Sequence, residues 1–157
     1  MPNIRRIRPG HAALRRGRTS RPHQTYLVTF TTSERAPHFA DTDAAITAAR
    51  AIEDPRIWEN SQLDAWVLMP DHWHGLISLG ERDELSTLMQ KLKTNVSRHV
   101  REARPEIARV WAVGFHDHAL RAEESIADAA RYIIRNPVER GLVRRVGDYP
   151  YWNAVWV

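Results

Sequence analysis

The sequence predicts an α+β fold in which an antiparallel β-sheet has helices packed on one of its faces. Strand-like segments rich in β-branched and aromatic residues alternate with helical segments, in the order strand, helix, two strands, helix, strand, helix. The two consecutive strands are joined by a tight turn, as in an antiparallel hairpin. A chain of 157 residues with 43% hydrophobic residues has the size and composition of one globular domain with a buried core.

The first half of the chain supplies three strands and one helix. Residues 26–31 are β-branched or aromatic apart from one leucine and predict the first strand. Asp41 is a suitable N-cap for a helix that runs to about Ile52 and stops before a proline. Residues 65–69 and 73–79 predict the next two strands, separated by a Pro-Asp turn. These patterns do not determine the order of the strands in the sheet.

The second half of the chain supplies two helices and a weaker strand. Residues 85–103 predict a long helix, because its apolar residues recur at helical spacing. These residues are Leu85, Leu88, Met89, Leu92, Val96 and Val100. Residues 110–120 predict one or two short strands, interrupted at Gly114. Residues 123–136 predict the last helix, with acidic residues at its N-terminus, and we expect it to end before Pro137.

The composition excludes several classes of function. The chain has no cysteine, which excludes disulfides, cysteine-ligated metal centres and thiol nucleophiles. Any metal site must therefore use histidine, aspartate, glutamate or amide ligands. No apolar run approaches the roughly 18 residues of a membrane span, and the N-terminal residues lack the apolar stretch of a secretory signal. We expect a cytoplasmic, nucleoid-associated bacterial protein.

Positive charge is concentrated at the N-terminus. Residues 1–21 contain no acid and seven of the 23 basic residues, which leaves 16 basic against 19 acidic residues, a net charge of −3, for residues 22–157. The seven are Arg5, Arg6, Arg8, Arg15, Arg16, Arg18 and Arg21. Arginine binds phosphates and guanine edges through two-point contacts, so we expect this arm to bind DNA, with a plain disordered tail as the alternative. Lys91, Arg98 and Arg101 form a second basic face, which is either solvated or follows a DNA backbone.

A His-Trp-His sequence in the third predicted strand is the first candidate for chemistry. Side chains alternate along a strand, so His72 and His74 point to one face and Trp73 points to the other. The two imidazoles, about 7 Å apart along the backbone, can converge on one cation while Trp73 anchors the strand in the core. Taken alone, such a pair is more often structural or solvated.

The second candidate is the helix that contains Tyr132 and Asn136. The two residues are four positions apart and therefore lie on the same face of the helix. This spacing can present a phenol and an amide oxygen to one point in space. The alternative is that Tyr132 is a half-buried core aromatic and that Asn136 caps the helix C-terminus.

Together, the two candidates form a coherent active site. Two imidazoles and one amide oxygen can hold a divalent metal cofactor, Mg²⁺ or Mn²⁺, and leave open positions for phosphate oxygens and water. The ion would polarise a scissile phosphate, and Tyr132 would attack the phosphorus. The resulting phosphotyrosine stores the bond energy, which distinguishes strand transfer from hydrolysis.

Several segments carry a resemblance to a known family. Residues 67–77 resemble the histidine–hydrophobic–histidine motif of single-tyrosine HUH transposases, and residues 130–143 resemble their tyrosine helix. With residues 115–121 and the Arg-Pro-Gly sequence at 8–10, they are most similar to the REP-associated tyrosine transposases. The resemblance covers about residues 5–145. It implies the HUH-endonuclease fold, a ferredoxin-like palm with an antiparallel sheet and helices.

The resemblance also implies a function. Members of that branch bind repetitive extragenic palindromes (REP elements), single-stranded DNA hairpins with a conserved tetranucleotide at the 5′ foot, and cleave near them to leave a 5′-phosphotyrosine and a free 3′-OH. By the matching motifs, His72 and His74 are metal ligands, Asn136 is the third ligand and Tyr132 is the nucleophile. Related transposases have glutamine in place of Asn136, which changes the distance to the metal. Related enzymes act as dimers, whereas this branch is expected to act as a monomer.

The predicted organisation has three parts: a basic DNA-binding arm (1–21), an HUH transposase catalytic domain (22–145) and an aromatic C-terminal tail (146–157). The tail contains four large aromatic residues, Tyr149, Tyr151, Trp152 and Trp156. They either dock the tail onto the body of the protein, stack on DNA bases or cover the active site. Docking is favoured.

Other assignments compete with this one. His116 and His118 form a second His-x-His sequence, which could hold the metal or bind DNA, although a salt-bridged strand is favoured. Tyr149 and Tyr151 are rival nucleophiles without a helical amide partner. The alternative functions are a rolling-circle replication initiator or relaxase-type nickase, and a catalytically silent DNA-binding regulator.

Overall fold

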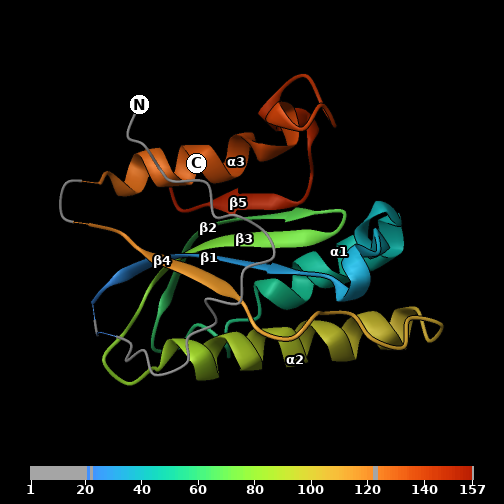
Figure 1. Ribbon diagram of the computed structural model, residues 1–157, viewed down its shortest axis with the longest axis horizontal. Coiled ribbons are helices and arrows are strands. Elements are labelled where there is room, and N and C mark those ends of the chain that lie inside the picture. Colours follow the sequence, from blue (N-terminus) through green and yellow to red (C-terminus); the bar gives the residue numbers. More distant parts are fainter. Residues whose placement is uncertain (1–20, 22, 122–123, 157) are drawn as a thin grey trace.

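The computed structural model describes residues 21, 23–121 and 124–156 (Figure 1). Within these residues, five strands form one antiparallel sheet in the order β4-β1-β3-β2-β5. The strands are β1 (Thr25–Thr31), β2 (Gln62–Met69), β3 (His72–Ser78), β4 (His116–Ala119) and β5 (Trp152–Ala154). The helices are α1 (Thr42–Ile52), α2 (Leu85–Ala103) and α3 (Ile126–Glu139), with 3-10 turns at Ser33–Arg35, His38–Ala40 and Val146–Asp148. The predicted α+β class with an antiparallel sheet is confirmed.

Local patterns located most of the elements. β1, α1, α2 and the β2–β3 hairpin lie where the sequence predicts them, and the Asp41 side chain accepts a hydrogen bond from the Ala44 backbone N–H at the start of α1. β2 begins earlier than expected, at Gln62. In the region 110–120 only β4 is a strand, and Trp111 forms an isolated bridge with Thr32.

The end of α3 differs from the prediction. The helix continues through Pro137 to Glu139 instead of stopping at Asn136. Its apolar face packs on the sheet as far as Pro137, and this burial holds the last turn in place despite the backbone hydrogen bond that proline lacks. The chain then leaves the helix at Gly141, whose φ of 75° is in the left-handed region that glycine adopts without strain.

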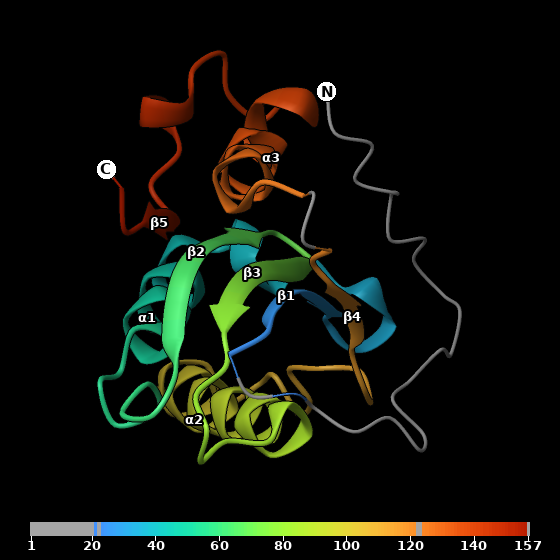
Figure 2. The ribbon, with the colours of Figure 1, turned by 90° about the vertical axis from the view of Figure 1, so that its left-hand side faces the viewer.

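The helices cover both faces of the sheet, not one face as predicted. α1 and α2 pack on one face, and α3 packs on the other (Figure 2). The reason is the sequence of the central strands, in which neighbouring positions are both apolar and both buried. In β1, Val28 faces α1 and α2 while Leu27 faces the side of α3; in β2, Leu68 and Val67 divide in the same way. A sheet with two apolar faces needs cover on both.

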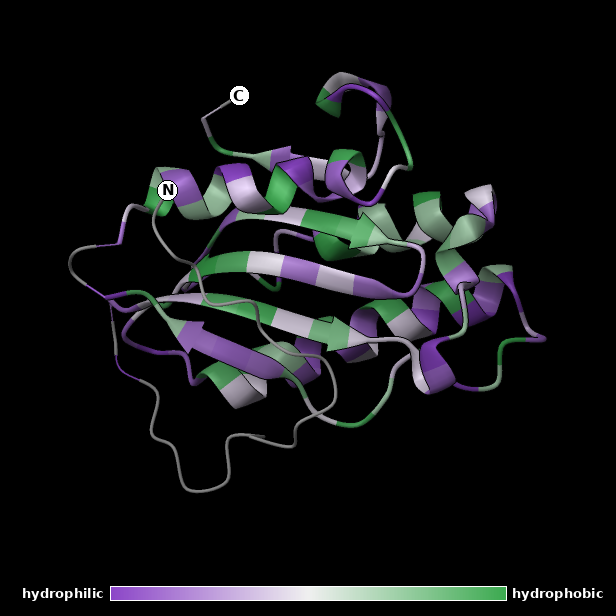
Figure 3. Ribbon diagram, turned by 45° about the horizontal axis from the view of Figure 1, so that its top comes forward, coloured by the Kyte–Doolittle hydropathy of each residue, from purple (hydrophilic) through white to green (hydrophobic). Residues whose placement is uncertain are grey.

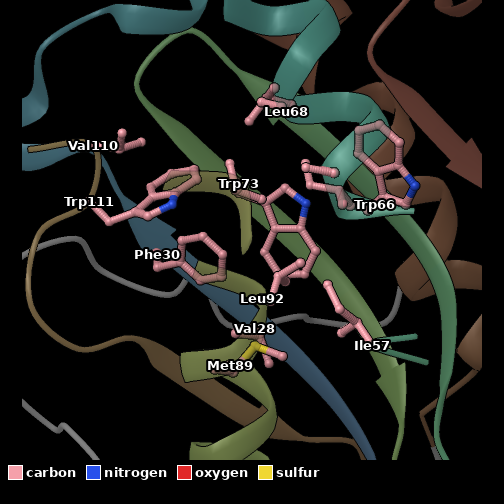
Figure 4. Close-up of a cluster of buried hydrophobic side chains, with 14 of the residues drawn as sticks. Val28, Phe30, Ile57, Trp66, Leu68, Trp73, Met89, Leu92, Val110 and Trp111 are labelled. Atoms are coloured by element: carbon pink, nitrogen blue, oxygen red, sulfur yellow. The ribbon is translucent and has the colours of Figure 1, made fainter. Parts of the chain in front are cut away.

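The larger core is organised around Trp73 (Figure 4). Its ring is fully buried and stacks on Phe30 with centroids 4.8 Å apart, and Trp111 meets Phe30 edge-on at 4.7 Å. The indole also lies over Gly75, where a Cβ would be 1.9 Å from the ring, so only glycine fits at that position. The strand that carries His72 and His74 is thus anchored from its opposite face, as the sequence predicted.

The edges of the sheet are unlike each other. β4 is a hydrophilic edge strand (Figure 3), and among the described residues β1 is its one pairing partner. At the other edge, β5 pairs with β2, and Tyr149 is buried with its hydroxyl donating to the Leu68 carbonyl. Docking of the aromatic tail is therefore confirmed for these residues, whereas Trp156 is 55% exposed. No helix among the described residues is long and apolar enough to cross a membrane.

Candidate active site

His72 and His74 lie side by side on the sheet face that α3 covers. Their ring centroids are 4.7 Å apart, and both side chains are buried, with 4% and 8% of their surface exposed. Trp73 points to the opposite face, into the larger core. The predicted arrangement of the pair is confirmed, and its burial argues against a merely solvated role.

Each histidine has a partner for its Nδ1 atom. The His72 Nδ1 lies 2.7 Å from Oδ1 of Asp71, and the His74 Nδ1 lies 2.7 Å from the Thr29 hydroxyl. A carboxylate can only accept, so His72 carries its proton on Nδ1 and presents a lone pair at Nε2. The Nε2 of His72 is buried and has no hydrogen-bond partner.

The electrostatics keep both imidazoles neutral. Burial lowers the pKa of His72, an effect that hydrogen bonding to Asp71 partly opposes. Burial lowers the pKa of His74 further, assisted by the neighbouring His72 and by the positive charges of Arg140 and Arg35. Neutral imidazole is the form that binds a metal ion.

α3 brings Tyr132 to this pair and carries Asn136 one turn further along the helix. The Tyr132 ring is half-buried, and its centroid is 6.4 Å from that of His74. Asn136 is 5% exposed, and its Oδ1 is buried without a hydrogen-bond partner. The helix continues to Glu139 and its C-cap is Arg140, so Asn136 is not the cap. Arg140, one turn further along, is close enough to lower the pKa of both histidines. The face of α3 from Tyr132 to Arg140 therefore follows the histidine pair.

The donor atoms at this site fit a divalent cation. A buried polar atom without a partner is costly, about 1–3 kcal/mol, and two of them, His72 Nε2 and Asn136 Oδ1, occur here. No group of three His, Cys, Asp or Glu side chains gathers anywhere in the described residues. A metal ion bound by His72 and His74 would therefore need a third donor of another type, and the amide oxygen of Asn136 is of a suitable type. Two nitrogens and one oxygen suit Mn²⁺ or Mg²⁺.

Comparison with known proteins identifies the family. Residues 20–136 match the family described as "Transposase IS200 like". The chain belongs to this family. It is 29% identical over 91 residues to the REP-associated tyrosine transposase of Escherichia coli K12, an alignment that covers 57% of this chain and 52% of the relative. It is 32% identical over 94 residues to a Haemophilus influenzae protein, covering 54% and 53%. The chain spans about half the length of the curated relatives it matches.

A solved structure of a REP-associated tyrosine transposase bound to a REP hairpin has the same fold. The TM-score is 0.68 at 24% sequence identity, and the match covers 86% of this chain and 79% of that chain. The resemblance predicted from the two motifs is confirmed at the level of family and fold.

The rival nucleophiles of this chain are poorly placed. The Tyr149 hydroxyl is buried and donates to the Leu68 carbonyl, and burial raises the pKa of its phenol. Tyr151 packs edge-on against Tyr149 with centroids 5.5 Å apart. Only Tyr132 among these three has a ring contact with a site histidine in the described residues.

The second His-x-His sequence is not gathered into the site. β4 is separated from β3 by β1 in the sheet. His118 pairs with Glu124, with 3.1 Å between Nε2 and Oε1. The favoured interpretation of a salt-bridged strand holds, with Glu124 as the partner of His118.

The predicted DNA-binding residues lie apart from the histidine pair. Lys91 and Arg98 are on α2, on the opposite side of the sheet, where they line a hollow of about 560 Å³ with Asn95. Arg98 also lines a hollow of about 670 Å³ with Arg101 and Arg109. The predicted DNA-binding arginines of the N-terminal arm, Arg5, Arg6, Arg8, Arg15, Arg16 and Arg18, lie outside the described residues.

Four residues of the site were missed by the sequence analysis. Asp71 precedes His72 directly, and this adjacency was a usable signal. Thr29 and Arg35 reach the site through strand pairing and a turn, which no local pattern reveals. Arg140 continues the Tyr132–Asn136 face by one more turn, so helical spacing could have found it.

Proposed function

We propose that this transposase cleaves and rejoins single-stranded DNA beside REP-type hairpins, with Tyr132 as the nucleophile. The observation that carries the proposal is the position of the Tyr132 ring, whose centroid is 6.4 Å from that of His74, on the same helix as the buried, unpartnered Oδ1 of Asn136. The names of the similar proteins, REP-associated tyrosine transposases, support the hairpin as the substrate.

The reaction is an exchange of phosphodiester bonds. The Tyr132 oxygen forms a bond to phosphorus as the bond from phosphorus to the 3′-oxygen breaks, which leaves a 5′-phosphotyrosine and a 3′-OH. The phenol proton passes to water or to the departing oxygen. Attack of a 3′-OH on the phosphotyrosine reverses the step, restores the DNA backbone and releases the tyrosine.

The residues around Tyr132 suit a phosphate substrate. His72, His74 and Asn136 would hold Mg²⁺ or Mn²⁺, which when bound polarises the phosphate and stabilises charge on its oxygens. Arg35 and Arg140 add positive charge on two sides of the histidine pair. Both histidines are buried, which limits the access of bulk water to their side chains.

The decisive experiment is incubation of the full chain with Mn²⁺ and a labelled REP-type hairpin oligonucleotide from the same genome. We expect a covalent protein–DNA adduct that survives denaturing electrophoresis, that chelation prevents and that Tyr132→Phe abolishes. An adduct with Tyr132→Phe would refute the nucleophile. Binding without any adduct would indicate a silent regulator, and nicking of a supercoiled origin plasmid instead of the hairpin would indicate a replication initiator or relaxase.

A further inference from the structure

Asp71, the residue before His72, is held from several directions. Its Oδ1 bonds to the His72 Nδ1 at 2.7 Å, and its Oδ2 accepts from the Arg35 guanidinium, with two nitrogens at 3.1 Å. Its backbone carbonyl accepts from both the N–H and the hydroxyl of Thr32, at 2.9 and 3.1 Å. Arg35, Asp71 and His72 therefore form a chain of contacts that ends at the buried, unpartnered Nε2 of His72.

The backbone that presents Arg35 is strained. Glu34 and Arg35 both have a φ of 56°, in the left-handed region that residues other than glycine rarely adopt. The Arg35 N–H donates to the Thr32 carbonyl, so the chain turns back on itself directly after β1. Strained residues persist where their surroundings hold them, and they gather at functional sites. Here the strained turn ends in the contact between Arg35 and Asp71.

We propose that Arg35 is a positioning residue of the active site: it holds the Asp71 carboxylate against His72 and thereby fixes the nitrogen that His72 presents to the metal. This inference rests on the proposed function for the identity of the ligand. A carboxylate that accepts from a histidine N–H fixes the tautomer and orientation of the ring. Arg35 does the same for the carboxylate, because it binds the oxygen that His72 does not use.

The charge of Arg35, taken alone, predicts the opposite change in metal affinity. The direction of that change in a variant without Arg35 therefore tests the positioning role. A guanidinium near a metal site repels the cation, so removing it should tighten metal binding. Arg140 provides the comparison, since its charge also acts on both histidines, and within the described part of the chain no hydrogen bond or ion pair joins its side chain to Asp71 or to either ring. If Arg35 acts by positioning, its removal must weaken metal binding while removal of Arg140 does not.

The first measurement is Mn²⁺ affinity of the full-length chain by titration calorimetry. Loss of a group that orients a metal ligand weakens binding about 10–100-fold. We expect about tenfold weaker binding for Arg35→Gln, partial recovery in Arg35→Lys, and equal or tighter binding for Arg140→Gln. Binding by Arg35→Gln that equals or exceeds that of the parent protein would overturn the positioning role.

The second measurement needs neither metal nor DNA. Two-bond ¹H–¹⁵N NMR spectra of the metal-free protein report which His72 nitrogen carries the proton. We expect the Nδ1–H form in the parent chain and a mixture of tautomers in Asp71→Ala and Arg35→Gln. Arg56→Gln is the matched control, because Arg56 forms a surface ion pair with Asp54 at 2.9 Å and should leave His72 unchanged.

The two measurements separate the inference from the proposed function. A parent chain that binds no Mn²⁺ would refute the metal site, but the His72 tautomer would still test Arg35. A His72 tautomer that is the same in Arg35→Gln as in the parent chain would overturn the inference, even if the adduct with hairpin DNA forms as proposed.

Discussion

The two His-x-His sequences of this chain share a spacing and a sheet face but not an environment. His74 and His116 are both paired with Thr29, and directly paired residues of an antiparallel sheet point to the same side. His74 is buried under α3 with a partner for Nδ1, whereas His116 is half-exposed on an edge strand. Spacing predicts which way two imidazoles point. Burial, partners and a covering helix determine whether they can hold a metal.

The largest difference should appear in catalysis. We expect His74→Ala to reduce formation of the DNA adduct at least about 100-fold, since loss of a ligand exceeds the usual effect of losing only its orienting partner. His116→Ala should change the rate less than about twofold, because β4 lies two strands away from β3. Initial rates on the labelled hairpin measure both variants, with circular dichroism to confirm that each is folded. Equal loss in the two variants would make the second pair part of the site.

The next largest effect is expected on stability, at Trp73, which anchors the strand that carries His72 and His74. Trp73→Ala should lower the free energy of unfolding by about 3–5 kcal/mol, because the buried indole fills the centre of the larger core. Gly75→Ala should also destabilise the protein, since a Cβ would meet the indole at 1.9 Å. Urea unfolding of both single variants and of the double variant gives the coupling free energy between positions 73 and 75.

The double variant tests whether the Trp73 indole is what requires a glycine at position 75. With Trp73→Ala already present, Gly75→Ala should cost much less than it does alone. Additive losses would show that Gly75 is required for something other than the Trp73 ring.

The strand that carries His72 and His74 and the helices α2 and α3 were predictable because their sequence signals are local. The strand predicted over residues 73–79 and the helix predicted from the six-residue apolar stripe of α2 need no knowledge of the rest of the chain, and both are confirmed. The Tyr132–Asn136 face was predictable for the same reason. Its position over the histidines, however, came from the combination of two motifs and not from either one.

The remaining features depend on contacts between distant segments. The hydrogen bond between Thr29 and His74 requires the register of two strands that are 45 residues apart in sequence. The position of α3 on the second face follows from packing against Leu27 and Val67, and the same packing carries the helix past Pro137. Neither hydrophobic periodicity nor the tendency of helices to end before proline predicts these contacts between distant segments.

A smaller difference should appear in the pH dependence of stability. Burial lowers the pKa of His74 well below the ordinary value of 6.5. Below about pH 6.5 the unfolded chain therefore gains a proton that the folded chain excludes, so stability is present above this pH and is lost as the pH falls. Each excluded proton contributes up to about 1.4 kcal/mol per pH unit. Urea unfolding between about pH 5 and 7.5 should show a shallower loss for His74→Gln than for the parent chain. An equal or steeper loss in His74→Gln would contradict the burial argument.

The smallest effect is expected at the ion pair of the second His-x-His sequence. The pKa of Glu124 is lowered chiefly by the Arg121 backbone N–H, which donates to Oε1 at 3.0 Å, and only in lesser part by His118. Glu124→Gln keeps an oxygen for that N–H and removes only the charge that faces His118. The free energy of unfolding at neutral pH should therefore change by less than about 1 kcal/mol, as for other pairs near the surface. The rate of adduct formation should stay within about twofold of the parent rate. A loss of adduct comparable to that of His74→Ala would mean that β4 contributes to catalysis, and the distinction between the two histidine pairs would fail.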